Sequence, residues 1–152
     1  MEHESLLALL PNTISNKVES IESLAGLTNQ SFKLITRKHA YVLRINAKHT
    51  DSFKIDRNQE LIILENAITA GIAPEIIFKD SENSILVTLF IDKEPWVEKD
   101  QYDRKKLKLL AQLFRKIHSL PKTGFSFEPE VIADNYFSNL QSRPEYVDFG
   151  KK

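Results

Sequence analysis

The chain has 152 residues, the size of one domain built around a single hydrophobic core. Its 21 basic residues balance 21 acidic residues, so the net charge favours neither nucleic acid nor an anionic membrane, and any anion site must be local. No apolar run is long enough to span a membrane and the first residues lack the basic region of a signal peptide, so we expect a cytoplasmic protein. The absence of cysteine excludes disulfides, zinc–thiolate sites and thiol nucleophiles.

Five segments rich in β-branched and aromatic residues predict β-strands. They cover residues 17–22, 31–36, 41–46, 75–79 and 85–91. The last segment is almost continuously apolar, which indicates a strand in the interior of the sheet. Before the strands, the leucines of residues 4–10 predict a short helix or an apolar arm that packs on the fold and ends at Pro11.

A helix is predicted between the third and fourth strands. Asp56 is the expected N-cap, with Gln59 three residues later as in a capping box. Glu60 falls at the edge of the apolar stripe of this helix. Gly71 supplies a left-handed C-cap, and Pro74 prevents the helix from continuing.

A linker follows the fifth strand and leads to a long amphipathic helix over residues 102–118. The apolar face of this helix consists of Leu107, Leu110, Ala111, Phe114 and Ile117. We expect Trp96 in the linker to be a packing anchor, with a substrate-facing position as the alternative. A brief helix is expected over residues 132–140, and residues 142–152 lack a strong pattern.

Residues 24–60 combine three features that phosphate-handling proteins use. Gly26 and Asn29 bound a short turn between the first two strands, Arg44 gives the third strand an oriented cation, and Glu60 places a carboxylate on the helix. A nucleotide needs donors around its phosphate oxygens and a fixed positive charge. Taken alone, the turn is equally well a tight strand connection, and the two charges are equally well solvated.

The order of these features resembles the N-terminal lobe of protein-kinase-like enzymes, and most closely the choline/ethanolamine kinase and aminoglycoside phosphotransferase family. The matching segments follow the family's order and lie within residues 17–121. They are residues 24–32, 41–45, 55–57 with Glu60, 70–74 and 113–121. The resemblance implies an α+β fold: a five-stranded antiparallel sheet with one helix between strands 3 and 4, followed by a linker and a long amphipathic helix.

The resemblance also implies that this lobe binds ATP, as Mg-ATP. The expected cofactor-binding residues are Gly26, Leu27, Thr28, Asn29, Ser31, Val42, Arg44, Glu60, Leu89 and Ile91. Backbone N–H groups of the turn would hold the phosphates, helped by polar side chains. Arg44 would contact the α- and β-phosphates while pairing with Glu60. Main-chain groups of Leu89 and Ile91 would bind adenine, whose ring would lie against Val42.

Three further residues attract attention. Asp56 and Arg57 also match the family pattern, but capping accounts for Asp56, and Arg57 is compatible with a position that faces water. His118 would serve as a general base only if it reached a substrate. We expect it instead to complete the packing of its helix or to interact with the helix C-terminus.

The groups that catalyse phosphoryl transfer in this family are missing from the sequence. They are an aspartate near the acceptor hydroxyl, an asparagine and a second acid on magnesium, set in H-x-D-x-x-x-x-N and I-D-[WF]-E-like motifs. Asp134 and Asn135 are adjacent, which is the wrong spacing, and the D-F-G letters within residues 147–150 are interpreted as coincidence. We therefore expect no catalytic and no metal-ligating residue in this chain.

The expected organisation is a kinase-like N-lobe over residues 1–91, a hinge with the first helix of the C-lobe over 92–121, and a truncated, partly irregular segment over 122–152. We expect the nucleotide-binding part of an ATP-dependent small-molecule kinase that is inactive alone. The alternative is a non-catalytic nucleotide- or partner-binding module, a pseudo-phosphotransferase, that forms homo-oligomers through the surface facing the C-lobe. Choline, ethanolamine, thiamine or an aminoglycoside would bind only if that lobe is supplied, and neither nucleic acid nor a membrane is an expected partner.

Overall fold

The computed structural model of the chain describes residues 3–26, 29–47, 56–124, 126 and 128–141. One antiparallel sheet forms its centre, with strand order β1-β2-β3-β5-β4. The strands are β1 (Val18–Leu24), β2 (Gln30–Thr36), β3 (Ala40–Ile45), β4 (Ile76–Asp80) and β5 (Ile85–Leu89). The predicted α+β class and five-stranded antiparallel sheet are confirmed, and β5 lies inside the sheet as its apolar sequence indicates.

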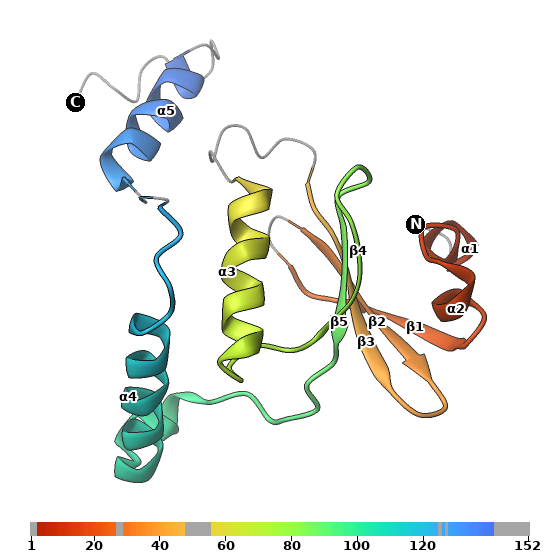
Figure 1. Ribbon diagram of the computed structural model, residues 1–152, viewed down its shortest axis with the longest axis horizontal. Coiled ribbons are helices and arrows are strands. Elements are labelled where there is room, and N and C mark those ends of the chain that lie inside the picture. The colour runs from red at the N-terminus through yellow and green to blue at the C-terminus, as the bar shows by residue number, and fades with distance from the viewer. Residues whose placement is uncertain (1–2, 27–28, 48–55, 125, 127, 142–152) are drawn as a thin grey trace.

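Helices lie on both faces of the sheet (Figure 1). They are α1 (His3–Leu7), α2 (Asn12–Ser15), α3 (Arg57–Thr69), α4 (Arg104–His118) and α5 (Pro129–Gln141), with a 3-10 helix, η2 (Glu98–Tyr102), before α4. The short helices α1 and α2 cover one face, and α3, which connects β3 to β4 as predicted, lies along the other. The predicted helix over residues 102–118 begins two residues later, at Arg104, because Asp103 caps it by accepting from the N–H groups of Lys105 and Lys106.

The hydrophobic core lies between the N-terminal helices and the sheet. Its buried residues are Leu6, Leu10, Ile14, Leu34, Leu43, Ile85 and Val87. The predicted packing role of the N-terminal segment is thus confirmed, although α1 ends at Leu7 rather than at residue 10. The N–H groups of Leu9 and Leu10 reach back only three residues, to Leu6 and Leu7, and this tighter turn leaves Leu10 in the core.

The two faces of the sheet differ because side chains alternate along each strand. Leu43 on β3 is fully buried on the core face, so its neighbours Val42 and Arg44 point to the opposite face. The antiparallel register sets Ser31 across from Arg44, and Lys33 across from Val42. This second face therefore carries polar and charged groups next to α3.

Both ends of α3 follow the predicted local rules. Asp56 accepts hydrogen bonds from the N–H groups of Asn58 and Gln59 at 2.9 and 3.2 Å. At the other end Gly71 has φ 67°, in the left-handed region. Its N–H donates to the carbonyl of Ile68, and the next N–H, of Ile72, donates to that of Ala67, which completes a Schellman motif. The start of α3, where the candidate site lies, is therefore fixed by a side-chain cap.

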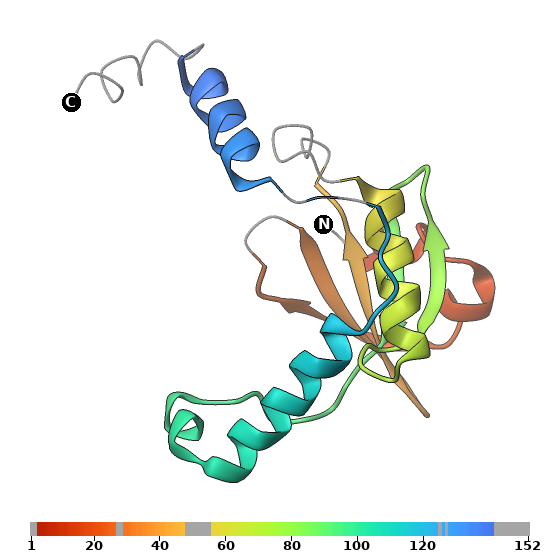
Figure 2. The same cartoon turned by 60° about the vertical axis from the view of Figure 1, so that its left-hand side comes forward.

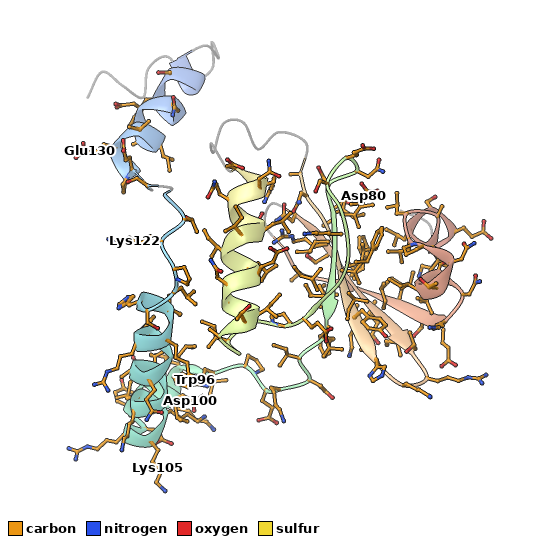
Figure 3. The ribbon with its side chains drawn as sticks, viewed as in Figure 1. Asp80, Trp96, Asp100, Lys105, Lys122 and Glu130 are labelled. Atoms are coloured by element: carbon orange, nitrogen blue, oxygen red, sulfur yellow. The ribbon has the colours of Figure 1, made fainter. Side chains whose placement is uncertain are left out.

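The linker after β5 is organised by local contacts (Figure 3). The buried carboxylate of Asp100 pairs with the ammonium group of Lys106 at 2.6 Å and accepts from the N–H of Val97. Lys106 also lies 5.9 Å from the ring centre of Trp96, which is about half exposed. Trp96 thus connects the linker to the start of α4 through Lys106, and the prediction that it is a packing anchor is supported only to the extent of this half-exposed contact.

The apolar face predicted for α4 is present but little covered. Its exposed members include Leu107, Phe114 and Ile117. Helix α5 stands apart from the sheet in both views (Figures 1 and 2). Within the described residues, no helix has the length and apolar character needed to cross a membrane.

Candidate functional site

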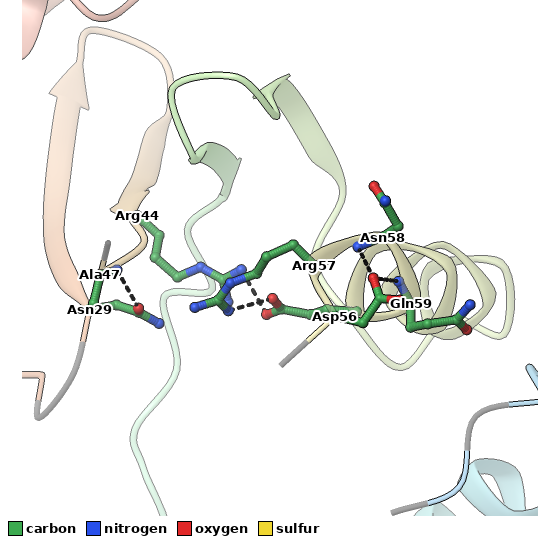
Figure 4. Close-up of polar contacts among 8 residues, drawn as sticks. Asn29, Arg44, Ala47, Asp56, Arg57, Asn58 and Gln59 are labelled. Carbon is green, nitrogen blue, oxygen red and sulfur yellow. Dashed lines mark hydrogen bonds and ion pairs between the residues drawn. The ribbon is translucent and has the colours of Figure 1, made fainter. Parts of the chain in front are cut away.

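The site is built around one carboxylate held by two guanidinium groups (Figure 4). Nη2 of Arg44 lies 2.7 Å from Oε1 of Glu60, and Nη1 of Arg57 lies 2.7 Å from Oε2 of the same residue. Each carboxylate oxygen therefore has its own cationic donor. All three side chains are about one quarter exposed, so the pairs are partly shielded from water.

The local structure explains how these three residues meet. Arg44 points from β3 toward α3 because it lies on the face opposite Leu43. Arg57 and Glu60 lie in the first turn of α3, and three residues along a helix brings side chains onto the same face. The cap at Asp56 fixes where this first turn begins.

The surroundings favour the charged form of Glu60. Partial burial raises the pKa of its carboxyl, but the hydrogen bond from Arg57 and the positive charge of Arg44 outweigh that effect, so the pKa lies below its ordinary value of 4.5. With Glu60 ionised, the cluster of two arginines and one carboxylate retains one excess positive charge. Such a cluster can attract an anion. When no anion is bound, both arginines are still paired with Glu60.

Several buried polar atoms around the cluster lack a protein partner among the described residues. They are Nε of Arg44, Nε of Arg57, Oδ1 of Asn46 and Oε1 of Gln59. The side chains of Arg44, Asn46 and Arg57 line a small pocket between α3 and the β4–β5 turn. The free Nε donors of both arginines fit an anionic or water-mediated ligand, because a buried donor without a partner is costly.

The turn between β1 and β2 adjoins the Arg44 end of the cluster. An added side chain on Gly26 would place its Cβ 2.6 Å from the carbonyl oxygen of Asn29, so only glycine fits this close approach. Oδ1 of Asn29 accepts from the N–H of Ala47 at 3.2 Å, which ties the turn to the chain just after β3. Ser31 lies across from Arg44. Leu27 and Thr28, also predicted to bind phosphate, lie outside the described residues.

The residues predicted to bind adenine lie at the other end of β3. Leu89 is across from Tyr41, and Val42 is across from Thr88. The N–H of Leu89 donates to the carbonyl of Glu75, and the carbonyl of Ile91 accepts from the N–H of Lys93. Outside the helices and strands of the described chain, no backbone hydrogen bond involves the Ile91 N–H. One donor thus remains available at this end.

The structure adds residues that sequence reasoning missed. Arg57 does not face water but shares Glu60 with Arg44, and the sequence signals for it were its match to the family pattern and its three-residue spacing from Glu60. Lys33 lies on the same sheet face, with Nζ 4.3 Å from the ring centre of Phe90. The alternation along β2 indicates the face of Lys33, but its contact with Phe90 depends on strand order.

The other candidate residues are separate from this site. His118 is exposed in the last turn of α4, and its ring stacks on Phe114. Asn135 on α5 donates to the carbonyl of Val131. Residues 147–150 lie outside the described part of the chain. Among the residues that the structure does describe, no group of three His, Cys, Asp or Glu could hold a metal ion.

A five-stranded antiparallel sheet with one helix between β3 and β4, and a strand arginine paired with a helix carboxylate, defines a kinase-like N-terminal lobe. Solved structures share this fold. A choline/ethanolamine kinase family protein from Mesorhizobium loti is 27% identical, with TM-score 0.66, over 90% of this chain and 44% of that chain. The choline kinase LicA from Streptococcus pneumoniae is 23% identical, with TM-score 0.72, over 97% of this chain and 50% of that chain.

A spectinomycin phosphotransferase solved with ADP and spectinomycin is more distant, at 15% identity and TM-score 0.53, over 93% of this chain and 54% of that chain. LicA has also been solved with AMP. The chain therefore spans about half the length of the solved proteins it matches. No protein-family model and no curated protein matches it. The resemblance to the N-terminal lobe of choline/ethanolamine kinases and aminoglycoside phosphotransferases is confirmed in the fold.

The Glu60 cluster predicts a specific pH dependence of stability. Because the pKa of Glu60 is lowered by folding, its ionised form stabilises the fold above about pH 4.5, and this contribution is lost as the pH falls through the folded-state pKa. We expect Glu60→Gln to lower the free energy of unfolding near neutral pH, and to lose less further stability than the unaltered chain between about pH 7 and pH 3. Urea unfolding at several pH values measures both effects.

Glu65→Gln is the matched control, since Glu65 lies on the same helix and pairs with Lys79 of β4 at 2.8 Å, but is about half exposed. An exposed pair contributes little, so this variant should keep nearly all of the pH dependence. Identical pH profiles for Glu60→Gln and the unaltered chain would contradict the stabilising role of the cluster.

Proposed function

We propose that the chain is the nucleotide-binding N-terminal part of an ATP-dependent small-molecule kinase of the choline/ethanolamine type. The observation that carries this proposal is the 2.7 Å pair between Arg44 of β3 and Glu60 of α3, with Ser31 of β2 directly across from Arg44. A guanidinium group fixed by a carboxylate can hold phosphate oxygens with its remaining N–H groups. The AMP and ADP complexes of the structural neighbours support a nucleotide as the ligand.

In this proposal the nucleotide lies along β3. Its phosphates meet Arg44, Ser31 and the backbone of residues 26–29, where Leu27 and Thr28 contribute as the sequence predicts. Its base meets Val42, with the Leu89 carbonyl as acceptor and the Ile91 N–H as donor. The edge of adenine offers the complementary pair, an amino donor next to a ring-nitrogen acceptor. Magnesium would be held mainly by the phosphates and by groups outside this chain.

The division at residues 91 and 121, the cytoplasmic location and the absence of catalytic residues stay predictions. The acceptor alcohol or amine, which is choline, ethanolamine, thiamine or an aminoglycoside in this proposal, would be bound by a second lobe. The sheet face with Arg44 supplies only the nucleotide half of such a site.

We expect the chain to bind Mg-ATP, and Arg44→Ala to weaken the affinity by about tenfold or more. The reason is that a hydrogen bond to a charged group contributes about 1.5–3 kcal/mol, and 1.4 kcal/mol corresponds to tenfold. Isothermal titration calorimetry measures the affinity directly. A thermal shift supports it, because a ligand that binds only the native state raises the melting temperature.

Arg37→Ala is the matched control for this measurement. It removes the same charge and a similar pair, in which Nε of Arg37 lies 2.8 Å from Oε1 of Glu19, but at the β2–β3 turn. We expect its affinity to equal that of the unaltered chain. Equal binding by the Arg44→Ala and Arg37→Ala variants would overturn the proposed phosphate role.

A second prediction concerns turnover. The 152-residue chain should not phosphorylate choline or ethanolamine, because positioning and electrostatic groups supply nearly all of the catalysis of phosphoryl transfer, and the sequence lacks the base and both magnesium ligands. An assay with ATP labelled in the γ-phosphate, run beside an active choline kinase, tests this. Labelled product formed by the purified chain would refute the prediction.

The second candidate function is a non-catalytic nucleotide- or partner-binding module that self-associates. The observation that favours it is the exposed apolar face of α4, where Leu107, Phe114 and Ile117 are each more than 40% exposed. Apolar patches of this kind commonly mark interaction surfaces. The gene separates the two functions: a kinase requires the two missing motifs downstream or in an adjoining reading frame, and a self-sufficient module does not.

We expect the isolated chain to self-associate through this face. Sedimentation velocity should give a larger sedimentation coefficient as concentration rises, and Phe114→Glu should abolish that increase by placing a charge on the patch. Gln112→Glu adds the same charge at another exposed position of α4 and should have no effect. A chain that stays monomeric at every concentration would exclude self-association.

A further inference from the structure

Lys33 occupies an unusual place for a lysine. It lies in the middle of β2, and the fully buried Leu34 beside it points to the opposite, core face. Its side chain is only 25% exposed. Lysine is strongly hydrated, so burying most of its side chain requires a compensating contact.

That compensation comes from an aromatic ring. Nζ of Lys33 lies 4.3 Å from the ring centre of Phe90, a cation–π distance. Its nearest carboxylate, on Glu22, is 3.9 Å away, which is long for a hydrogen-bonded pair. The main chain of Phe90 is held in place, because its N–H donates to the carbonyl of Ala40 at 2.9 Å. The main contact of the Lys33 ammonium group is thus the Phe90 ring.

This contact lies at the base end of the proposed nucleotide site. Lys33, Val42 and Thr88 form one cross-strand row on the face that carries Arg44. Phe90 stands between Leu89 and Ile91, the residues whose main-chain groups would pair with the base edge. A base against Val42 would therefore have Lys33 beside it.

The direction of the side chain separates Lys33 from the phosphate cluster. Arg44 lies across from Ser31, in the cross-strand row next to the one formed by Lys33 and Val42. Neighbouring rows on one face of a sheet are about 7 Å apart along the strand. The ammonium group of Lys33 is directed to Phe90, at the end of β5, and not to the turn after β1. Its geometry suits a ring rather than a phosphate group.

The geometry points to Lys33 as a base-recognising residue whose ammonium group, held beside Phe90, contacts the face of the bound nucleobase. This inference rests on the proposed nucleotide-binding function and adds a residue to it. A nucleobase presents an aromatic face to a cation, as Phe90 does, so the ammonium group gains a further ring contact when the ligand arrives. Lys33 therefore contributes to affinity for the nucleoside part and not for the phosphates.

Isothermal titration of Mg-ATP and of magnesium tripolyphosphate, which lacks a base, tests this. Lys33→Met keeps the aliphatic stem but removes the charge, and should weaken Mg-ATP binding by about 3- to 30-fold while changing tripolyphosphate binding by less than about twofold. Lys33→Arg retains a cation that stacks on rings and should bind Mg-ATP nearly as tightly as the unaltered chain. Lys17→Met, at an exposed position just before β1, removes the same charge and should change neither ligand.

The outcomes distinguish this inference from the proposed function. If Lys33→Met weakens both ligands equally, or neither, the base-recognising role is overturned while nucleotide binding stands. If Lys33→Arg binds Mg-ATP as poorly as Lys33→Met, the cation is not what the site uses, and the role is likewise overturned. If neither ligand binds the unaltered chain, the proposed function fails and the inference fails with it.

Discussion

The site depends on Glu60 accepting from two arginines at once. Without this carboxylate, the guanidinium groups of Arg44 and Arg57 would repel each other, and each would regain about 2 kcal/mol of side-chain entropy as it became mobile. With it, the first turn of α3 is joined to β3 by the charge-assisted pair between Arg44 and Glu60. One interaction thus orders two cations, orients the helix and sets the local charge.

Side chains alternate along the strands, so one face of the sheet forms the hydrophobic core and the other carries the candidate site. Leu34 and Leu43 are fully buried against the N-terminal helices, and the residues next to them, Lys33 and Arg44, project to the other face. Because a shift of one residue would exchange the two faces, the buried leucines also determine the direction of both cations. The core therefore positions the candidate site, and Ile85 belongs to both, because it is buried in the core and lines the pocket beside Arg44.

Local sequence rules predicted much of this structure. They could not predict the contacts that depend on strand order. The cap at Asp56 and the left-handed Gly71 follow from short-range chemistry, so the ends of α3 were predictable. The facing of Arg44 and Glu60 was also predicted, from alternation and family order. The pairing of Arg57 with Glu60 was not predicted, because an arginine at the start of a helix can equally well pair with a neighbouring side chain or face water. The stacking of Lys33 on Phe90 joins residues 57 positions apart, and no local pattern encodes it.

The core cluster lies wholly between Leu6 and Val87, and none of its buried members comes from α4 or α5. The lobe is thus a module whose buried core is formed without α4 and α5, although the base end of the candidate site extends past β5 to Phe90 and Ile91. A module of this kind can be combined with different second halves while its own fold is conserved. The neighbours are consistent with such reuse, since the same fold is present in a choline kinase and in a spectinomycin phosphotransferase.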